Sequence, residues 1–190
     1  MPHEKIVLYV GRLVYEKGIH ILINAIPKIL AKVDAKFVIV GSGYMQEQLS
    51  NIVKSMGLEH KVLFTGFVDE QNLLKLQKVA DVSVVPSLFE PFGIVALEAM
   101  AAKSPVVVSD TGGLSEIVDH DKTGVKVYPN NTDSLAWGIT KILTDANYAK
   151  HIRENAYKVI LEKFDWDKIA QQTRQMYEAV LGEYSKSFWA

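Results

Sequence analysis

The 190-residue sequence contains no cysteine and no long hydrophobic run. Without cysteine the chain can form neither a disulfide nor a thiolate metal site, which fits a reducing compartment. No apolar segment approaches the roughly 18 residues that a membrane-spanning helix needs, and the first residues do not resemble a signal peptide. We therefore expect a cytoplasmic protein with no integral membrane segment.

The chain also lacks an excess of charge of either sign. It has 21 Lys and Arg residues against 22 Asp and Glu residues, a formal net charge of −1, and no basic run that would mark a nucleic-acid surface. Its five histidines show no ligand spacing. Two Asp-x-Asp triplets, 119–121 and 165–167, lie in a predicted turn and at a helix start, where aspartate is favoured for capping. We expect no nucleic-acid partner, no bound metal and no cofactor.

Hydrophobic residues make up 48% of the chain and occur in short segments. Apolar segments that read as strands are Lys5–Val10, Lys36–Val40, Val62–Thr65, Val82–Val85, Val106–Ser109 and Val125–Val127. Amphipathic helical patterns separate them, and Pro27 is expected to kink the first helix. This alternation predicts an α/β fold with a doubly wound, Rossmann-like parallel sheet of about six strands.

After Pro129 the strand pattern stops, and helices are predicted over 133–145, 146–163 and 166–182. These C-terminal helices exceed what the sheet needs for cover, so we expect part of this region to pack against something outside the chain. Phe188 and Trp189 place two large aromatic side chains near the end, and the oligomeric state stays open. We expect residues 1–190 to form one domain.

The most informative stretch runs from Pro86 to Met100, where a predicted strand ends and a helix begins. Gly93 allows close approach of the backbone to a ligand, and a helix starting near Ile94 offers free N–H groups. Glu90 and Glu98 lie eight residues apart on either side of this helix start. The segment predicts a site for a polyhydroxylated anion, whereas the alternative is a loop carboxylate and a glutamate on the helix surface.

A second candidate segment, Gly11–Gly18, follows the first strand directly. Ligands of open α/β sheets bind beyond the carboxyl ends of the strands, so Arg12 and Lys17 stand where phosphates bind. Two cations and a helix N-terminus can offset the charge of a diphosphate leaving group without a metal. The alternative is two solvated surface cations.

Three further loops give weaker signals. Gly41-Ser42-Gly43 lacks the third glycine of a dinucleotide fingerprint, and Gly66-Phe67-Val68 could turn its backbone toward a nucleobase. Residues 110–117 contain paired glycines that free N–H groups for phosphate or sugar. That loop could equally be a flexible turn in which Thr111 or Ser115 caps the next helix.

Three motifs stand in one order: Gly-Arg-Leu-x-x-Glu-Lys-Gly at 11–18, Glu-Pro-Phe-Gly-Ile-Val-x-Leu-Glu-Ala-Met at 90–100, and Gly-Gly-Leu-Ser-Glu-Ile-Val at 112–118. Together they resemble the donor-binding, C-terminal half of retaining glycosyltransferases of group 1, which have the two-domain GT-B fold. The resemblance covers essentially the whole chain. Residues 110–114 are also similar to glycogen and starch synthases of the archaeal type.

This resemblance implies a role for each matching residue. Arg12 and Lys17 would hold the diphosphate of the sugar donor, and Glu90 would bind a sugar hydroxyl near the anomeric centre. Glu98 would accept both ribose hydroxyls, and the Val68 backbone would meet the base. The remaining implied contacts to the donor come from Gly11, Phe92, Gly93, Ile94, Val95, Thr111 and Gly112.

The resemblance further implies a UDP-, ADP- or GDP-sugar as donor, transferred with retention and without a metal. A separate N-terminal domain would bind the acceptor, so this chain alone would be inactive or nearly so. Alternatives are a non-catalytic nucleotide-sugar-binding module or half of a UDP-sugar epimerase. One departure from the family pattern is Lys103, which occupies a position where the helix after Glu98 usually ends in glycine.

Overall fold

The computed structural model describes residues 4–186, so Phe188 and Trp189 lie outside the described residues. The chain divides into two compact units, Met1–Tyr157 and Lys158–Ala190. Within the described range, no helix is both long and apolar enough to cross a membrane.

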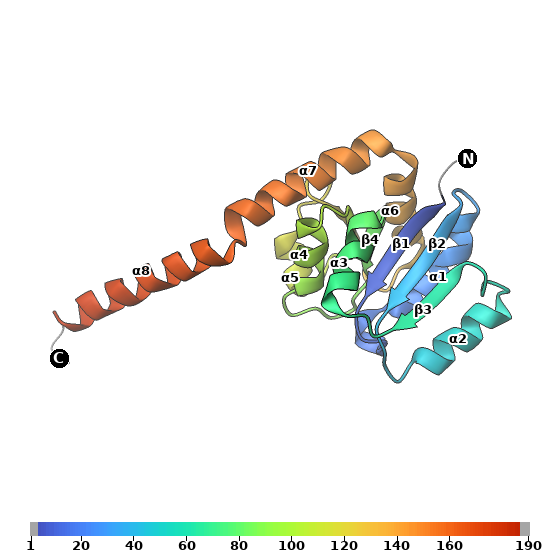
Figure 1. Ribbon diagram of the computed structural model, residues 1–190, viewed down its shortest axis with the longest axis horizontal. Coiled ribbons are helices and arrows are strands. Elements are labelled where there is room, and N and C mark those ends of the chain that lie inside the picture. The colour runs from blue at the N-terminus through green and yellow to red at the C-terminus, as the bar shows by residue number, and fades with distance from the viewer. Residues whose placement is uncertain (1–3, 187–190) are drawn as a thin grey trace. The chain divides into compact units, whose positions relative to one another are not determined.

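The first unit contains one six-stranded sheet with the order β3-β2-β1-β4-β5-β6, and every neighbouring pair of strands is parallel (Figure 1). The strands are β1 Lys5–Val10, β2 Ala35–Val40, β3 Val62–Gly66, β4 Val82–Val85, β5 Val106–Ser109 and β6 Val125–Val127. The prediction of a doubly wound parallel sheet is confirmed. Each predicted strand is present, with β2 beginning and β3 ending one residue beyond the prediction.

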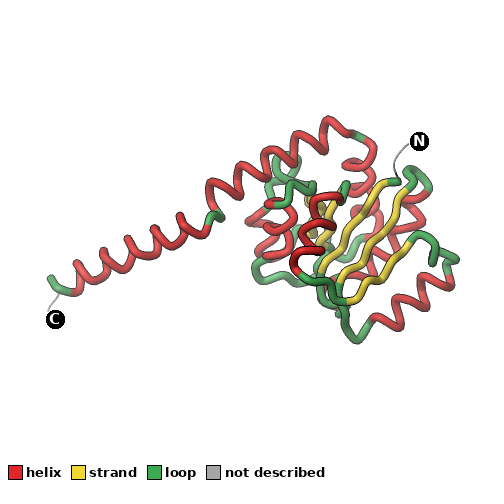
Figure 2. Tube along the Cα trace, in the orientation of Figure 1, coloured by secondary structure: helices red, strands yellow, loops and turns green. Residues whose placement is uncertain are grey.

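Helices cover both faces of this sheet, as Figure 2 shows with strands in yellow and helices in red. Helices α1 and α6 pack against each other, and α6 also contacts β4, β5 and β6, whereas α3 contacts β1 and α4 contacts β4 and β5. The helices of the first unit are α1 Ile19–Leu30, α2 Gln46–Ser55, α3 Glu70–Val79, α4 Ile94–Ala101, α5 Gly112–Ile117, α6 Thr132–Thr144 and the start of α7 Ala146–Lys163. A 3-10 helix, η1 Tyr15–Lys17, precedes α1.

The alternation of side chains along each strand divides the core between the two faces. Val7 and Tyr9 of β1 belong to the large cluster formed with α1, α2 and α6, whereas Leu8 points into a smaller cluster with Val38 and Val40. Successive strand residues point to opposite faces, so a strand covered on both sides is apolar throughout. Because all neighbouring strands are parallel, their carboxyl ends lie along one edge of the sheet, the carboxyl edge, where the loops that follow the strands meet.

Two details of the helices bear on local predictions, of which the kink expected at Pro27 stays a prediction. Helix α1 continues through Pro27 to Leu30, and the Ala31 N–H bonds back to the Pro27 carbonyl at 3.1 Å, so the proline does not end the helix. Lys103, after α4, adopts a left-handed conformation with φ 60°, and its ammonium lies 4.3 Å from the centre of the Tyr157 ring. The helix end therefore tolerates a residue other than glycine.

The second unit contains the end of α7 and α8, Trp166–Tyr184. The Asp165 side chain accepts hydrogen bonds from the N–H groups of Asp167 and Lys168, which confirms its predicted capping role. Helix α8 has no buried residue, and its exposed apolar side chains include Met176 and Tyr177. The expectation that this region packs against something outside the chain stays a prediction.

Candidate functional site

The loops that follow β1, β4 and β5 converge at the carboxyl edge of the sheet. The N–H groups of Leu88 and Phe89 donate to the Glu16 carbonyl at 2.8 and 3.3 Å, which joins the β4 loop to the β1 loop. The Gly113 N–H donates to the Glu90 carbonyl at 3.0 Å and joins the β5 loop to the same segment. Segments up to about 100 residues apart in sequence thus form one continuous surface.

Two glycines permit this convergence. Gly18 has φ 64°, and a Cβ there would lie 1.9 Å from the Pro86 carbonyl oxygen. Gly112 has φ 48°, and a Cβ there would lie 2.1 Å from the Glu90 carbonyl oxygen. Both positions combine a left-handed backbone with a direct backbone contact, so no residue with a side chain fits without moving a loop.

The central polar contact of this surface joins Lys17, at the end of η1, to Glu90 in the β4 loop. The Lys17 Nζ and Glu90 Oε2 atoms are 2.6 Å apart, and both side chains are largely buried. Ser87 Oγ donates to the same carboxylate oxygen at 3.1 Å. The second oxygen, Glu90 Oε1, accepts no hydrogen bond from the residues that the structure describes, so it can receive a hydroxyl group of a ligand.

Arg12 lies in the same loop after β1 as Lys17 and is held through its backbone. The Tyr9 hydroxyl donates to the Arg12 carbonyl oxygen at 2.9 Å, and the Tyr9 side chain is almost fully buried. Burial, and secondarily the negative charge of Glu90, raises the pKa of Tyr9, so the hydroxyl keeps its proton and remains a donor. The Arg12 side chain is exposed and has no hydrogen bond or ion pair within residues 4–186.

Sequence reasoning missed Tyr9. It stands in an apolar strand, where a tyrosine reads as an ordinary core residue. The only available signal was its position, three residues before an arginine in a glycine-bounded loop. Its role as an anchor depends on the path of that loop, which the strand pattern does not show.

Helix α4 points its N-terminus at this surface. Its N-cap is Gly93, with φ 104°, and no side chain caps the helix. The N–H groups of Ile94 and Val95, which make no hydrogen bond within the described residues, are therefore available to an anion, whereas those of Ala96 and Leu97 bond to the Gly93 carbonyl. Gly93 is buried, Val95 is half-buried, and the side chains of Phe92 and Ile94 are exposed.

Backbone hydrogen bonds connect the loop after β3 to the end of β2, and the end of β2 to the loop after β1. The Gly41 N–H donates to the Gly66 carbonyl at 2.8 Å, and the Gly11 N–H donates to the Val40 carbonyl at 3.0 Å. The Val68 side chain packs on the smaller core cluster. The three loops that carried only weak sequence signals thus lie at the edge that carries Arg12 and Lys17.

Glu98 is the fifth residue of α4. It lines a cavity of about 250 Å³ between α3 and α4, together with Glu70, Leu73 and Gln77. Partial burial raises the pKa of Glu98, and an electrostatic contact with the Gln77 amide opposes that rise. This contact falls short of a regular hydrogen bond, because Gln77 Nε2 has no such partner within the described residues.

The structure joins several of the predicted site residues through direct contacts. Lys17, Glu90, Gly112 and Thr111 form one contact set, in which Thr111 Oγ1 donates to the Leu88 carbonyl at 3.4 Å instead of capping α5. Glu98 makes no hydrogen bond or ion pair with Lys17 or Glu90 in the described part of the chain. The roles assigned to these residues in ligand binding stay predictions.

The two Asp-x-Asp triplets have structural partners. Asp121 pairs with the Lys141 ammonium at 2.7 Å, and Asp165 caps α8. Across residues 4–186, no group of three or more histidine, aspartate or glutamate side chains has an arrangement that could hold a metal ion.

Comparison with known protein families matches residues 2–159 to the family of glycosyl transferases group 1. The uncharacterized glycosyltransferase MJ1607 of Methanocaldococcus jannaschii is 52% identical over 178 residues, which cover 94% of this chain and 46% of that protein. The glycogen synthase of Mycobacterium tuberculosis H37Rv is 39% identical over 173 residues, covering 90% and 42% respectively. The chain thus spans about half the length of the curated relatives it matches.

Solved structures show the same architecture. The C-terminal domain of a group 1 glycosyl transferase from Francisella tularensis matches with a TM-score of 0.80 and 28% identity, covering 87% of this chain and 89% of that one. The Anabaena protein HepE, in complex with UDP-glucose, matches with a TM-score of 0.84 and 30% identity, covering 93% of this chain and 49% of HepE.

Proposed function

Because the chain belongs to the group 1 glycosyltransferase family, we propose that it binds the sugar donor, a nucleotide-diphosphate sugar, for a retaining and metal-independent hexosyl transfer. The observation that carries this proposal is the contact between Lys17 and Glu90 beside the uncapped N-terminus of α4. It combines a cation, helix N–H groups and a carboxylate oxygen within one surface. A phosphorylated sugar needs these three kinds of partner.

The charges account for the chemistry that the site can supply. Breaking the bond between the sugar and the diphosphate leaves negative charge on the phosphate oxygens. Lys17, Arg12 and the positive end of α4 stabilise that charge as it develops. Glu90 orients the Lys17 ammonium with one oxygen and keeps the other for a sugar hydroxyl.

Two relatives guide the choice of donor. HepE was solved with UDP-glucose, and a glycogen synthase is 39% identical to this chain. These likenesses support a glucosyl donor with UDP-glucose as the first probe, and glycogen synthesis as one outcome for the complete enzyme. ADP-glucose and GDP-sugars are the competing donors.

The relatives are about twice as long as this chain. That difference supports the proposal that a further domain binds the acceptor and completes the catalytic cleft. The chain by itself then binds the donor and transfers little or no sugar. A transfer assay with labelled UDP-glucose and the isolated chain measures this directly.

Calorimetric titration with UDP-glucose tests the binding role. We expect Arg12→Ala to weaken binding by about 10- to 150-fold, because a charge-assisted bond to phosphate contributes roughly 1.5–3 kcal/mol. The fold should be unaffected, since the Arg12 side chain has no hydrogen bond or ion pair within the described residues. Arg174→Ala, an exposed arginine of α8, is the matched control. Equal affinity of the Arg12 variant and the wild type would refute the assignment.

A further inference from the structure

A second cavity lies at the carboxyl ends of β5 and β6. Its volume is about 680 Å³, and it is lined by the β5 end, the turn before β6, β6 itself and the first turns of α6. The lining residues that matter here are Asp110, His120, Lys126, Tyr128, Asp133 and Trp137. This size is typical of a small-molecule site.

Two aromatic side chains line this cavity and remain open to solvent. Tyr128 is 75% exposed, and Trp137 is 47% exposed. Gly138, next to Trp137, packs α6 tightly on the sheet, since a Cβ there would lie 2.8 Å from Val127 Cγ1. This close packing places the indole beside the end of β6.

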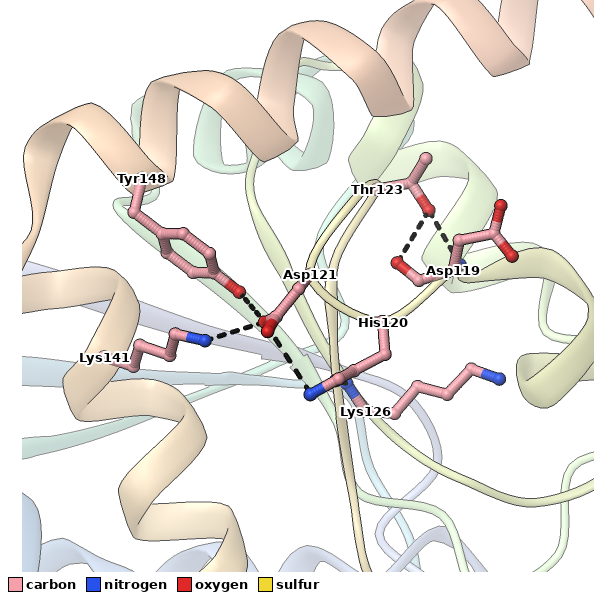
Figure 3. A network of polar contacts seen from close by, with 7 residues as sticks. All are labelled: Asp119, His120, Asp121, Thr123, Lys126, Lys141 and Tyr148. Atoms are coloured by element: carbon pink, nitrogen blue, oxygen red, sulfur yellow. Dashed lines mark hydrogen bonds and ion pairs between the residues drawn. The ribbon is translucent and has the colours of Figure 1, made fainter.

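A polar network holds the cavity wall in place, as Figure 3 shows. The Asp121 carboxylate pairs with Lys141 at 2.7 Å, accepts a hydrogen bond from Tyr148 and lies 3.7 Å from His120 Nε2. It thereby ties the turn before β6 to α6 and α7. The backbone N–H of Lys126 donates to His120 Nδ1 at 3.0 Å. In the neutral imidazole the ring proton is therefore on Nε2.

Two side chains, those of His120 and Lys141, lie against the Trp137 ring. The His120 ring lies 6.3 Å away between centroids, and the Lys141 ammonium lies 5.2 Å from the indole centre. These contacts restrain the indole before any ligand binds. A restrained ring loses less conformational freedom on binding.

The charges of the lining disfavour an anionic ligand. Among the lining residues are two carboxylates and one ammonium, and Lys126 already pairs with Asp110 at 3.4 Å and donates to the Ser115 carbonyl at 2.8 Å. Asp133 is paired with Lys28, at 2.5 Å. No unpaired cation among the described lining residues remains for a phosphate. Asp110 and Asp133 are paired as well, but an ionised carboxylate has about four acceptor positions, so each can still accept hydrogen bonds from hydroxyl groups.

We propose that this cavity binds a neutral oligosaccharide of hexose units. The apolar face of each sugar ring would pack on Tyr128 and Trp137, while its hydroxyls would donate to Asp110 and Asp133. Asp110 immediately precedes Thr111 in the loop after β5, so a bound oligosaccharide would run beside the proposed donor site. That role in transfer rests on the proposed function, whereas binding itself does not.

The test uses the 190-residue chain labelled with ¹⁵N and two probes, maltoheptaose and cellohexaose, which differ in anomeric linkage. Trp137→Phe identifies the indole N–H signal of Trp137. At least one probe should shift that signal saturably. If neither probe shifts it at 10 mM, or if UDP-glucose shifts it more than both, the proposal is wrong.

Tyr128→Ala supplies the second arm, because this exposed side chain has no packing role that folding requires. We expect about a tenfold or greater loss of oligosaccharide affinity, with UDP-glucose affinity within twofold of the wild type. Tyr177→Ala, an exposed tyrosine of α8, is the matched control and should change neither. Unchanged oligosaccharide affinity in Tyr128→Ala overturns the proposal. Failure of the donor assignment is recognised separately, by the Arg12→Ala titration.

Discussion

The loops after β1, β4 and β5 differ from the cavity beside β6 in what holds them together. In the loops, backbone groups meet directly at glycines: Gly18 against Pro86, and Gly112 against Glu90. At the cavity, contacts between side chains join the elements, because Asp121 contacts Lys141, Tyr148 and His120. The loops are thus joined largely by main-chain contacts at glycines, to which the Lys17–Glu90 ion pair is added, whereas the cavity depends on charged and aromatic side chains.

This difference determines how each site responds to mutation. A glycine that meets another backbone segment has no room for an added methyl group, so a substitution at that glycine should damage the fold. A side-chain site can lose one partner and keep its backbone, so substitutions there should alter binding or pH dependence first. The predictions below test this contrast, from the largest expected effect to the smallest.

Gly18→Ala should have the largest effect. The new Cβ would meet the Pro86 carbonyl, and the left-handed φ adds strain, so we expect the free energy of unfolding to fall by about 2–5 kcal/mol. Urea denaturation measures the change. Gly57→Ala is the matched control, because Gly57 has φ 67° but no atom within 4 Å of its Cβ position, and it should lose only about 1–2 kcal/mol. Equal losses would show that the loop contact carries no cost of its own.

Tyr9→Phe should have an intermediate effect. It removes the hydroxyl that donates to the Arg12 carbonyl in a partly buried bond, so we expect a loss of about 1 kcal/mol in unfolding free energy. UDP-glucose affinity should also fall a few-fold, since the Arg12 backbone loses its anchor. Tyr128→Phe removes an exposed hydroxyl and should change stability by less than about 0.5 kcal/mol. A Tyr9 variant with unchanged donor affinity would mean that the loop is positioned without this bond.

Asp121→Asn should have a small effect that depends on pH. The pairing with Lys141, and then the bond from Tyr148, lowers the pKa of Asp121 in the folded state. The carboxylate therefore contributes stability above its unfolded pKa, and that contribution is lost as the pH falls through the folded pKa. Because the side chain is about half exposed, we expect a loss of about 0.5–1 kcal/mol at pH 7. The loss should shrink below about pH 4.

Glu98→Gln provides the comparison of opposite sign. Partial burial raises the pKa of Glu98, so its carboxylate opposes folding at neutral pH. Replacing Glu98 with glutamine should raise the unfolding free energy by a few tenths of a kcal/mol at pH 7. The gain should vanish at a pH low enough to protonate Glu98 in both the folded and the unfolded state. Urea denaturation of both variants at pH 7 and pH 3.5 checks the signs. A shared sign at pH 7 would contradict the electrostatic account.

Much of the fold could be predicted because its signals are local. Each strand is an apolar run covered on both faces, so the boundaries of Val82–Val85 and Val106–Ser109 follow from the run itself. The placement of Gly11–Gly18 and residues 90–100 at one edge follows from parallel topology, which brings the carboxyl ends of strands together. These predictions needed no knowledge of side-chain contacts.

The site could be predicted only in part, because its contacts are long-range. The bond from Tyr9 to Arg12 depends on a loop turning back, and the cavity that Glu98 lines depends on how α4 lies against α3. The β6 cavity combines residues of β5, β6 and α6 that form no motif. No spacing in the chain indicates such a set.

The order of apolar runs and glycine-bounded loops was sufficient by itself to specify a doubly wound sheet, the edge at which its loops meet and the family resemblance, because hydrophobic burial and backbone sterics act within a few residues. Tertiary structure alone decided which charges meet. It paired Lys17 with Glu90, placed Glu98 at a cavity between α3 and α4, and formed an open cavity with exposed aromatic side chains beside β6. The reason is that an ion pair or a cavity depends on distances across the folded chain, and these exist only once helices have packed on the sheet.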